Sequence, residues 1–143
     1  MRFMMLVYPK GYEGSAPETV PDPKHVIEMG KYNQELTDAG VLRAMDGLDS
    51  PARGARVTFD TGKAVVRDGP FTETKELIAG FWLLQVRSKE ECIEWVKRCP
   101  NPMEGASEIE IRQVFDADDF GEALTPELRA QEERMRAAGA KIG

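Results

Sequence analysis

The sequence contains few of the residues from which metal centres and disulfide frameworks are built. Its 143 residues include a single histidine and two cysteines, Cys92 and Cys99. Both cysteines fall on one predicted helix, about 10 Å apart along its axis at ~1.5 Å per residue, which is too far for a disulfide. One histidine and two separated thiols also make no zinc site. We therefore expect core thiols in a reducing compartment, no metal and no cofactor.

The chain also lacks any long apolar run. The apolar stretch Phe3–Tyr8 stops at Pro9, which makes it too short for the core of a signal peptide, and no other stretch approaches the length of a membrane span. The net charge of −6 at pH 7 argues against unaided binding to nucleic acid or anionic lipid, because both require a basic surface. These absences predict a cytoplasmic protein that binds neither nucleic acid nor membrane.

Sequence motifs of several catalytic classes are missing as well. There is no Gly-x-Ser-x-Gly motif, no phosphate-cradling glycine loop and no histidine close to a cysteine in the sequence. These absences weigh against chemistry that needs a strong nucleophile. Proton transfer and simple ligand binding remain as the options with the fewest requirements.

What the sequence does contain is the pattern of a small α+β domain. Apolar and alternating stretches predict four strands, the third of them central and covered on both faces. These strands are Phe3–Tyr8, Val41–Met45, Ile78–Val86 and Ser107–Phe115. Capping residues and helical spacing predict two helices. These are Pro23–Ala39, with the inward stripe His25, Met29, Tyr32, Leu36 and Ala39, and Lys89–Arg98.

A β-hairpin is predicted between the second and third of these strands. Arg56–Phe59 and Lys63–Val66 flank the turn Asp60–Gly62, where Gly62 supplies the positive φ. The resulting order β–α–β, hairpin, β–α–β is that of a split βαβ fold, in which both helices cover one face of an antiparallel sheet. The other face then needs a cover, and no third layer remains in the sequence. We therefore expect a symmetric homodimer.

The C-terminal part of the chain differs in character. Residues 1–115 form the predicted split βαβ domain, and residues 116–143 form an acidic linker and a C-terminal helix that begins near Thr125. This helix has a thin apolar stripe, mainly Leu128 and Met135, and an isolated helix of this length is unstable in water. We expect it to dock on a partner subunit or to stay undocked.

The most distinctive stretch of the chain combines a sharp turn with a charged loop. It reads Asp68-Gly69-Pro70-Phe71-Thr72-Glu73-Thr74-Lys75-Glu76, and Gly80-Phe81 follows in the next strand. This run resembles the signature of the DGPF proteins of the YCII-related family, and the similarity covers roughly Met1 to Phe115. The resemblance implies a ferredoxin-like dimeric α/β barrel. It also implies a link to extracytoplasmic-function sigma factors, because DGPF proteins often look like companions of them.

His25 and Asp68 are the candidates for catalysis. His25 lies in the first turn of a predicted helix, where the helix dipole disfavours the imidazolium and keeps the ring available as a base. The resemblance implies a dyad between a histidine at this place and an aspartate, and we assign Asp68 as that aspartate. The alternative is a half-buried histidine that bonds a backbone carbonyl, together with an aspartate that bonds its own turn.

A charged loop held in place by proline and phenylalanine is a good position for a binding site. The predicted ligand-binding residues are Gly69, Pro70, Phe71, Glu73, Lys75, Glu76 and Tyr8. The alternative is a solvated loop whose charges pair with one another.

Two functions fit these features. The first is a homodimeric protein that binds a small molecule in a pocket near the DGPF loop, with proton transfer by His25 and charge stabilisation by Lys75. The second is a non-catalytic regulatory module that works with a sigma factor. The sequence specifies neither the ligand nor a reaction.

Overall fold

The computed structural model describes residues 1–9, 22–69, 77–102 and 106–139. The chain divides into two compact units, Met1–Gln113 and Val114–Gly143. The sequence placed the corresponding boundary between residues 115 and 116. The larger unit is a mixed α+β domain built on an antiparallel sheet.

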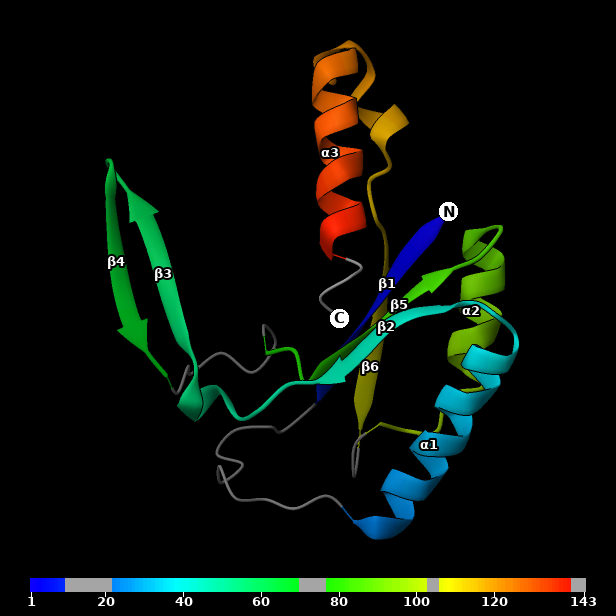
Figure 1. Ribbon diagram of the computed structural model, residues 1–143. Helices are drawn as coiled ribbons and strands as arrows, with labels where there is room; N and C mark the ends of the chain where they lie inside the picture. The colour runs from blue at the N-terminus through cyan, green and yellow to red at the C-terminus, as the bar shows by residue number, and fades with distance from the viewer. Residues whose placement is uncertain (10–21, 70–76, 103–105, 140–143) are drawn as a thin grey trace. The chain divides into compact units, whose positions relative to one another are not determined.

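Four antiparallel strands form the main sheet of the larger unit (Figure 1). They are β1 (Arg2–Pro9), β2 (Leu42–Gly47), β5 (Gly80–Gln85) and β6 (Ser107–Gln113). Their order is β2-β5-β1-β6, and β1 pairs antiparallel with both β5 and β6. This order separates the strands of each β–α–β unit by one strand of the other, which is consistent with the predicted split βαβ pattern.

The two helices of this unit begin at the capping residues that the sequence offers. Helix α1 (Pro23–Asp38) begins after Asp22, whose side chain accepts a hydrogen bond from the backbone N–H of Lys24. Helix α2 (Lys89–Lys97) begins after Ser88, whose hydroxyl accepts from the N–H of Glu91. Both helices lie on the same side of the sheet (Figure 1). Each cap satisfies an amide that has no partner within its helix.

The core lies between this helical layer and one face of the sheet. Alternate residues of β1 and β5 point into it, as the two-residue period of a strand requires. The buried core residues of strands and helices are Phe3, Met5, Val7, Tyr32, Leu36, Trp82, Leu84 and Cys92. The inward stripe predicted for the first helix is buried only in its middle. His25 and Met29 are half-buried, and Ala39 is exposed because the helix has ended before it.

The strand predicted to be central is an inner strand of the sheet, between β2 and β1. Trp82 and Leu84 of β5 are buried under the helices, whereas Phe81 and Leu83 point to the other face and are half-buried. The sequence predicted that this strand is covered on both faces, and its burial is complete only on the face that packs against the helices.

One polar contact joins the sheet to α1 inside this core. The indole N–H of Trp82 donates to the side-chain oxygen of Asn33 at 2.7 Å. The ring of Trp82 also meets Tyr32 edge to face, with centroids 6.0 Å apart. The Tyr32 hydroxyl donates to the carbonyl of Trp95 on α2 at 2.8 Å, and burial raises the pKa of this phenol. The aromatic pair therefore ties both helices to β5.

Both cysteines are free thiols, as predicted from their spacing. Cys92 is fully buried in the core and Cys99 is half-buried at the end of α2. Burial raises the pKa of Cys92 to about 11 and that of Cys99 to about 12. Because the thiolate is the reactive form, both thiols are poor nucleophiles near neutral pH.

The segment of the chain between β2 and β5 forms a separate two-stranded sheet (Figure 1). Strands β3 (Ala55–Asp60) and β4 (Lys63–Asp68) pair antiparallel, and Asp60 faces Lys63 across the turn. Thr61 and Gly62 both have positive φ, at 45° and 80°, as a two-residue turn of this kind requires. A short 3₁₀ helix η1 (Pro51–Arg53) precedes the hairpin.

The smaller unit contains a 3₁₀ segment η3 (Ala117–Ala123) and helix α3 (Pro126–Gly139). Neither element has a buried residue. The rings of Phe115 and Phe120 pack at 5.5 Å, and Arg129 on α3 pairs with Asp118 at 3.1 Å. None of the helices in the described ranges is both long and apolar enough to cross a membrane.

The Trp82–Asn33 contact gives a direct test of the core. Replacing Asn33 with Ala leaves a buried indole N–H without an acceptor, which we expect to cost about 1–3 kcal/mol in the free energy of unfolding. Urea denaturation followed by tryptophan fluorescence measures this loss. Gln34→Ala is the matched control, because Gln34 bonds Asp38 on the exposed side of the same helix. Equal stability of the two variants would contradict the assigned role of Asn33.

Candidate functional site

Several segments of the chain meet at one end of the main sheet. There β1 and β2 end, and β5 begins at Gly80, which pairs with both Val7 and Gly47. The backbone N–H of Ala79 donates to the carbonyl of Val7 at 2.9 Å. The charged loop of the sequence enters β5 at this end, through the buried Leu77. Its predicted site residues lie outside the described residues: Pro70, Phe71, Glu73, Lys75 and Glu76.

We call the sheet face opposite α1 and α2 the second face. The register of the strands assigns its residues, because directly opposed residues of an antiparallel pair share a face. The apolar members are Met4, Leu6, Phe81 and Leu83 on the inner strands β1 and β5. The polar members from β1 and β6 are Tyr8, Glu108, Glu110 and Arg112. The second face thus has an apolar centre and a polar margin along β6.

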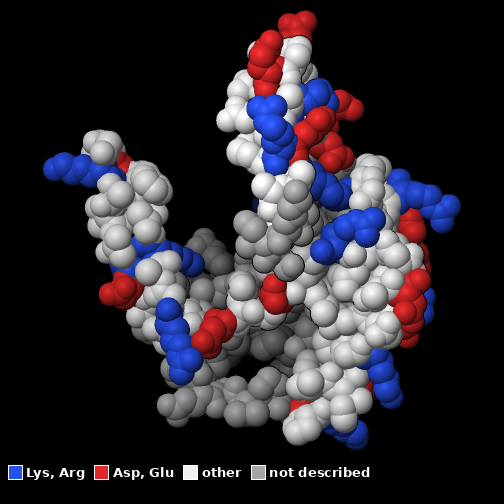
Figure 2. Space-filling model, in the orientation of Figure 1, with Lys and Arg blue, Asp and Glu red and all other residues white. Residues whose placement is uncertain are grey.

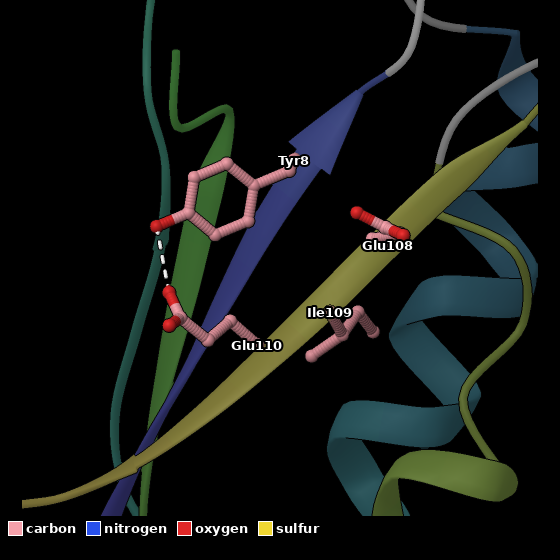
Figure 3. Close-up of a pocket in the computed structure, with 4 residues that line it drawn as sticks. All are labelled: Tyr8, Glu108, Ile109 and Glu110. Carbon is pink, nitrogen blue, oxygen red and sulfur yellow. Dashed lines mark hydrogen bonds between the residues drawn. The ribbon is translucent and has the colours of Figure 1, made fainter. Parts of the chain in front are cut away.

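Tyr8 and Glu110 form a hydrogen-bonded pair on this margin (Figure 3). The Tyr8 hydroxyl donates to a carboxylate oxygen of Glu110 at 2.9 Å. They line a shallow, open pocket together with Glu108 and Ile109. The bond to Glu110, burial and the charge of Glu110 raise the pKa of the Tyr8 phenol, while Arg112 opposes this shift. The phenol therefore stays protonated near neutral pH and serves as a hydrogen-bond donor.

His25 lies in the first turn of α1, as the sequence predicted, and is half-buried. Its Nε2 lies 3.0 Å from the carbonyl oxygen of Pro102. A carbonyl oxygen only accepts, so this contact places a proton on Nε2 and leaves Nδ1 as the acceptor in the neutral ring. This geometry is that of the alternative interpretation, a half-buried histidine that bonds a backbone carbonyl. It leaves one ring nitrogen available for proton transfer.

Asp68 is the last residue of β4 and is exposed. In the hairpin register it lies opposite Ala55. No hydrogen bond or ion pair between Asp68 and His25 is present in the described part of the chain. The two residues of the predicted dyad are therefore not brought together by the contacts of this structure.

Gly69 approaches another part of the backbone very closely. Its N–H donates to the carbonyl of Gly54 at 2.9 Å. A Cβ atom at Gly69 would lie only 1.8 Å from the carbonyl oxygen of Pro51, far inside van der Waals contact. The glycine of the Asp-Gly-Pro turn thus closes the base of the hairpin against η1. The described contacts of Gly69 are structural, and none of them involves a predicted ligand-binding residue.

Tyr8 was predicted from the sequence as a ligand-binding residue, whereas its hydrogen-bond partner Glu110 was not among the predicted site residues. The alternation in Ser107–Phe115 already placed Glu110 on the polar side of its strand, whereas Ile109 and Ile111 lie on the other side of the same strand. The sequence could not show that β6 pairs with β1 in the register that sets Glu108 opposite Tyr8. The phenol oxygen, whose proton is donated to Glu110, and the two carboxylates present hydrogen-bond acceptors, which suit a ligand that carries hydroxyl or amine groups. Within the described residues, no group of three or more potential metal ligands occurs.

The contact of Gly69 predicts a local effect of substitution. Gly69→Ala forces the base of the hairpin away from η1, so we expect amide hydrogen exchange in 53–69 to accelerate about tenfold or more. Exchange followed by mass spectrometry reads this segment directly. The control is Gly47→Ala, because a Cβ at Gly47 meets nothing within 4 Å. Unchanged exchange in Gly69→Ala would contradict the close approach.

The Tyr8–Glu110 pair predicts a titration shift. Glu110→Gln removes the carboxylate that accepts from the phenol and opposes its ionisation, so the pKa of Tyr8 should fall toward its ordinary value. NMR of ring-labelled tyrosine against pH measures the shift, and Tyr8→Phe assigns the signal. Glu108→Gln is the control, since Glu108 is not among the causes that shift the Tyr8 pKa. A larger shift in the control than in Glu110→Gln would refute the assignment.

Comparison with known proteins agrees with this fold. A family model described as the YCII-related domain matches residues 1–118. An uncharacterized protein of Rhizobium meliloti (strain 1021) is 26% identical over 114 residues, which cover 80% of this chain and 92% of that protein. The family match includes all four strands of the main sheet, both core helices and the hairpin. The chain therefore belongs to the YCII-related family.

Proposed function

We propose that this chain is a homodimeric YCII-related protein of the DGPF branch that binds a small molecule at the end of its main sheet. The observation that carries the proposal is the Tyr8–Glu110 pair on the second face. It lies at the end of the sheet where the DGPF loop enters β5. The phenol oxygen and the carboxylates at such a position accept hydrogen bonds from polar groups of a ligand.

The homodimer is supported by the composition of the second face. Its apolar centre consists of Met4, Leu6, Phe81 and Leu83, all on inner strands and all half-buried. Both helices of the larger unit pack on the other face. Apolar side chains on a two-sided sheet are stabilised when a second layer removes them from water. A second copy of the sheet would supply that layer and close a dimeric α/β barrel.

Acid–base catalysis by His25 is a separable part of the proposal. Nε2 is held by the carbonyl of Pro102, which fixes the ring and leaves Nδ1 to take a proton. His25 lies on the helical side of the sheet and Tyr8 on the second face. Catalysis by His25 therefore needs a ligand that reaches around the end of the sheet.

The binding site is tested by ligand recovery. We expect purified protein, denatured and extracted, to release a small molecule that mass spectrometry detects in proportion to protein. Glu110→Gln and Tyr8→Phe should lower its recovery about tenfold, because each removes one polar contact of the ligand. Glu90→Gln makes the same charge change at an exposed position of α2 and should retain full recovery. Equal recovery from all variants would exclude this site.

His25 is tested with the compound recovered in this way. His25→Gln keeps a side-chain amide donor for the carbonyl of Pro102 but removes the imidazole ring. We expect loss of turnover with the melting temperature nearly unchanged. A collapse in stability would assign His25 a structural role, and full turnover would exclude it from catalysis.

The homodimer is tested by sedimentation of the full chain over a concentration series. Leu6→Arg places a charge at the centre of the second face and should weaken the dimer roughly 100-fold or more. Ile27→Arg is the matched control, because Ile27 is an exposed aliphatic residue on α1. A wild-type chain that stays monomeric at all concentrations would refute the homodimer.

The second candidate function is regulation of an extracytoplasmic-function sigma factor. It is favoured by the smaller unit, where α3 exposes Leu128 and Met135 seven residues apart, on one side of the helix. Such a stripe suits a helix partner in another protein. Co-purification of a sigma factor with the wild-type chain but not with a Leu128→Glu, Met135→Glu double variant would favour this function. Equal binding of the sigma factor to the wild-type chain and to the double variant would exclude α3 as the contact surface.

A further inference from the structure

The β3–β4 hairpin has one apolar face and one charged face. Val57 lies opposite Val66, and Phe59 lies opposite Ala64. Because side chains alternate along a strand, these residues and Ala55 share one face. We call this set the apolar face of the hairpin: Ala55, Val57, Phe59, Ala64 and Val66. The other face carries every charged residue of the two strands except Asp68: Arg56, Asp60, Lys63 and Arg67.

The apolar face of the hairpin is exposed in this chain. Phe59 is 82% exposed, Val66 65% and Val57 48%. Figure 2 shows an uncharged stretch along the hairpin between charged groups at its tip and at its base. Segregation of apolar from charged side chains is typical of a hairpin that packs one face on another surface. A two-stranded hairpin by itself is at best marginally stable in water.

The occupant that fits this face is a second copy of the same chain. A patch of five side chains on two six-residue strands is on the order of a few hundred Å², which is below the roughly 800 Å² per partner of a stable interface. The patch therefore suits an addition to a larger contact. The second face of the main sheet offers that larger contact, with Leu6 and Phe81 at its centre.

The hairpin is attached to the domain at one end of the main sheet. The chain leaves the main sheet at Gly47 and returns to it at Gly80, and these two residues pair with each other. Gly69 closes the base of the hairpin against η1. The hairpin is thus tethered at the end of the sheet where Tyr8 and its pocket lie.

We propose that the β3–β4 hairpin is an arm that packs its apolar face on a second copy of this chain, beside the contact between the two second faces. This inference rests on the homodimer proposed above and adds a surface to it. Phe59 is the largest and most exposed member of the face and is its anchor, because aromatic side chains dominate the energetics of interfaces. The charged face of the arm stays in water.

Two neighbouring valines provide a matched test of the arm. Val66 lies on the apolar face, while Val65 lies on the charged face and is similarly exposed, at 58%. Sedimentation of the full chain should give a dissociation constant about tenfold higher for Phe59→Ser and several-fold higher for Val66→Ser. The dissociation constant of Val65→Ser should stay within about twofold of the wild-type value. This variant makes the same side-chain change as Val66→Ser, but on the charged face of the hairpin. Circular dichroism verifies that each variant is folded.

The outcomes separate the arm from the dimer. A wild-type chain that is monomeric throughout overturns the homodimer and the arm with it. A dimer that Leu6→Arg weakens but Phe59→Ser and Val66→Ser leave unchanged keeps the homodimer and overturns the arm. An equal effect of Val65→Ser and Val66→Ser also overturns it, because the assigned faces would then not matter.

A cross-link identifies the occupant directly. With a photoreactive benzoyl-phenylalanine in place of Phe59, irradiation of the purified protein should give a product of twice the chain mass. A cross-link confined to the same chain overturns the proposal, because the arm would then fold back on its own subunit. Irradiation in cells that gives only an adduct to a different protein overturns it as well.

Discussion

The burial of a single face of the main sheet is the constraint on which the rest of this structure depends. Strand β1 is paired on both sides, so its alternate residues Phe3, Met5 and Val7 form the floor of the core under α1 and α2. The same alternation sends Met4 and Leu6 to the second face. A strand that is apolar on both faces and covered by helices on only one is stabilised by a further layer. The proposed homodimer and ligand site both derive from this asymmetry.

Backbone contacts, and not side-chain chemistry, account for what the structure shows of the DGPF motif. Gly69 lies against the carbonyl of Pro51 and bonds that of Gly54, which fixes the point where the hairpin returns to the domain. A residue with a Cβ atom does not fit at that distance. Gly69 therefore fixes the end of the hairpin against η1. In the proposed dimer, this contact positions the base of the arm.

The candidate site was predictable in part. Tyr8 and His25 were both candidates from the sequence alone, His25 because it is the single histidine and lies in the first turn of a predicted helix. The partners of both residues were not predictable, because they are distant in the chain. Glu110 lies 102 residues after Tyr8, and Pro102 lies 77 residues after His25. Contacts over such separations depend on strand register and loop path, for which local sequence patterns carry no signal.

The sequence by itself determined the elements: the caps at Asp22 and Ser88, the turn at Gly62 and the alternation along each strand are local properties of backbone and side chain. Only the tertiary structure decided which of these local faces meet. It placed the Tyr8 phenol on Glu110 and turned the ring of His25 toward a carbonyl. It also left the apolar face of the hairpin exposed. The reason is that local periodicity states which side chains share a face, whereas packing across the whole chain settles what lies opposite that face.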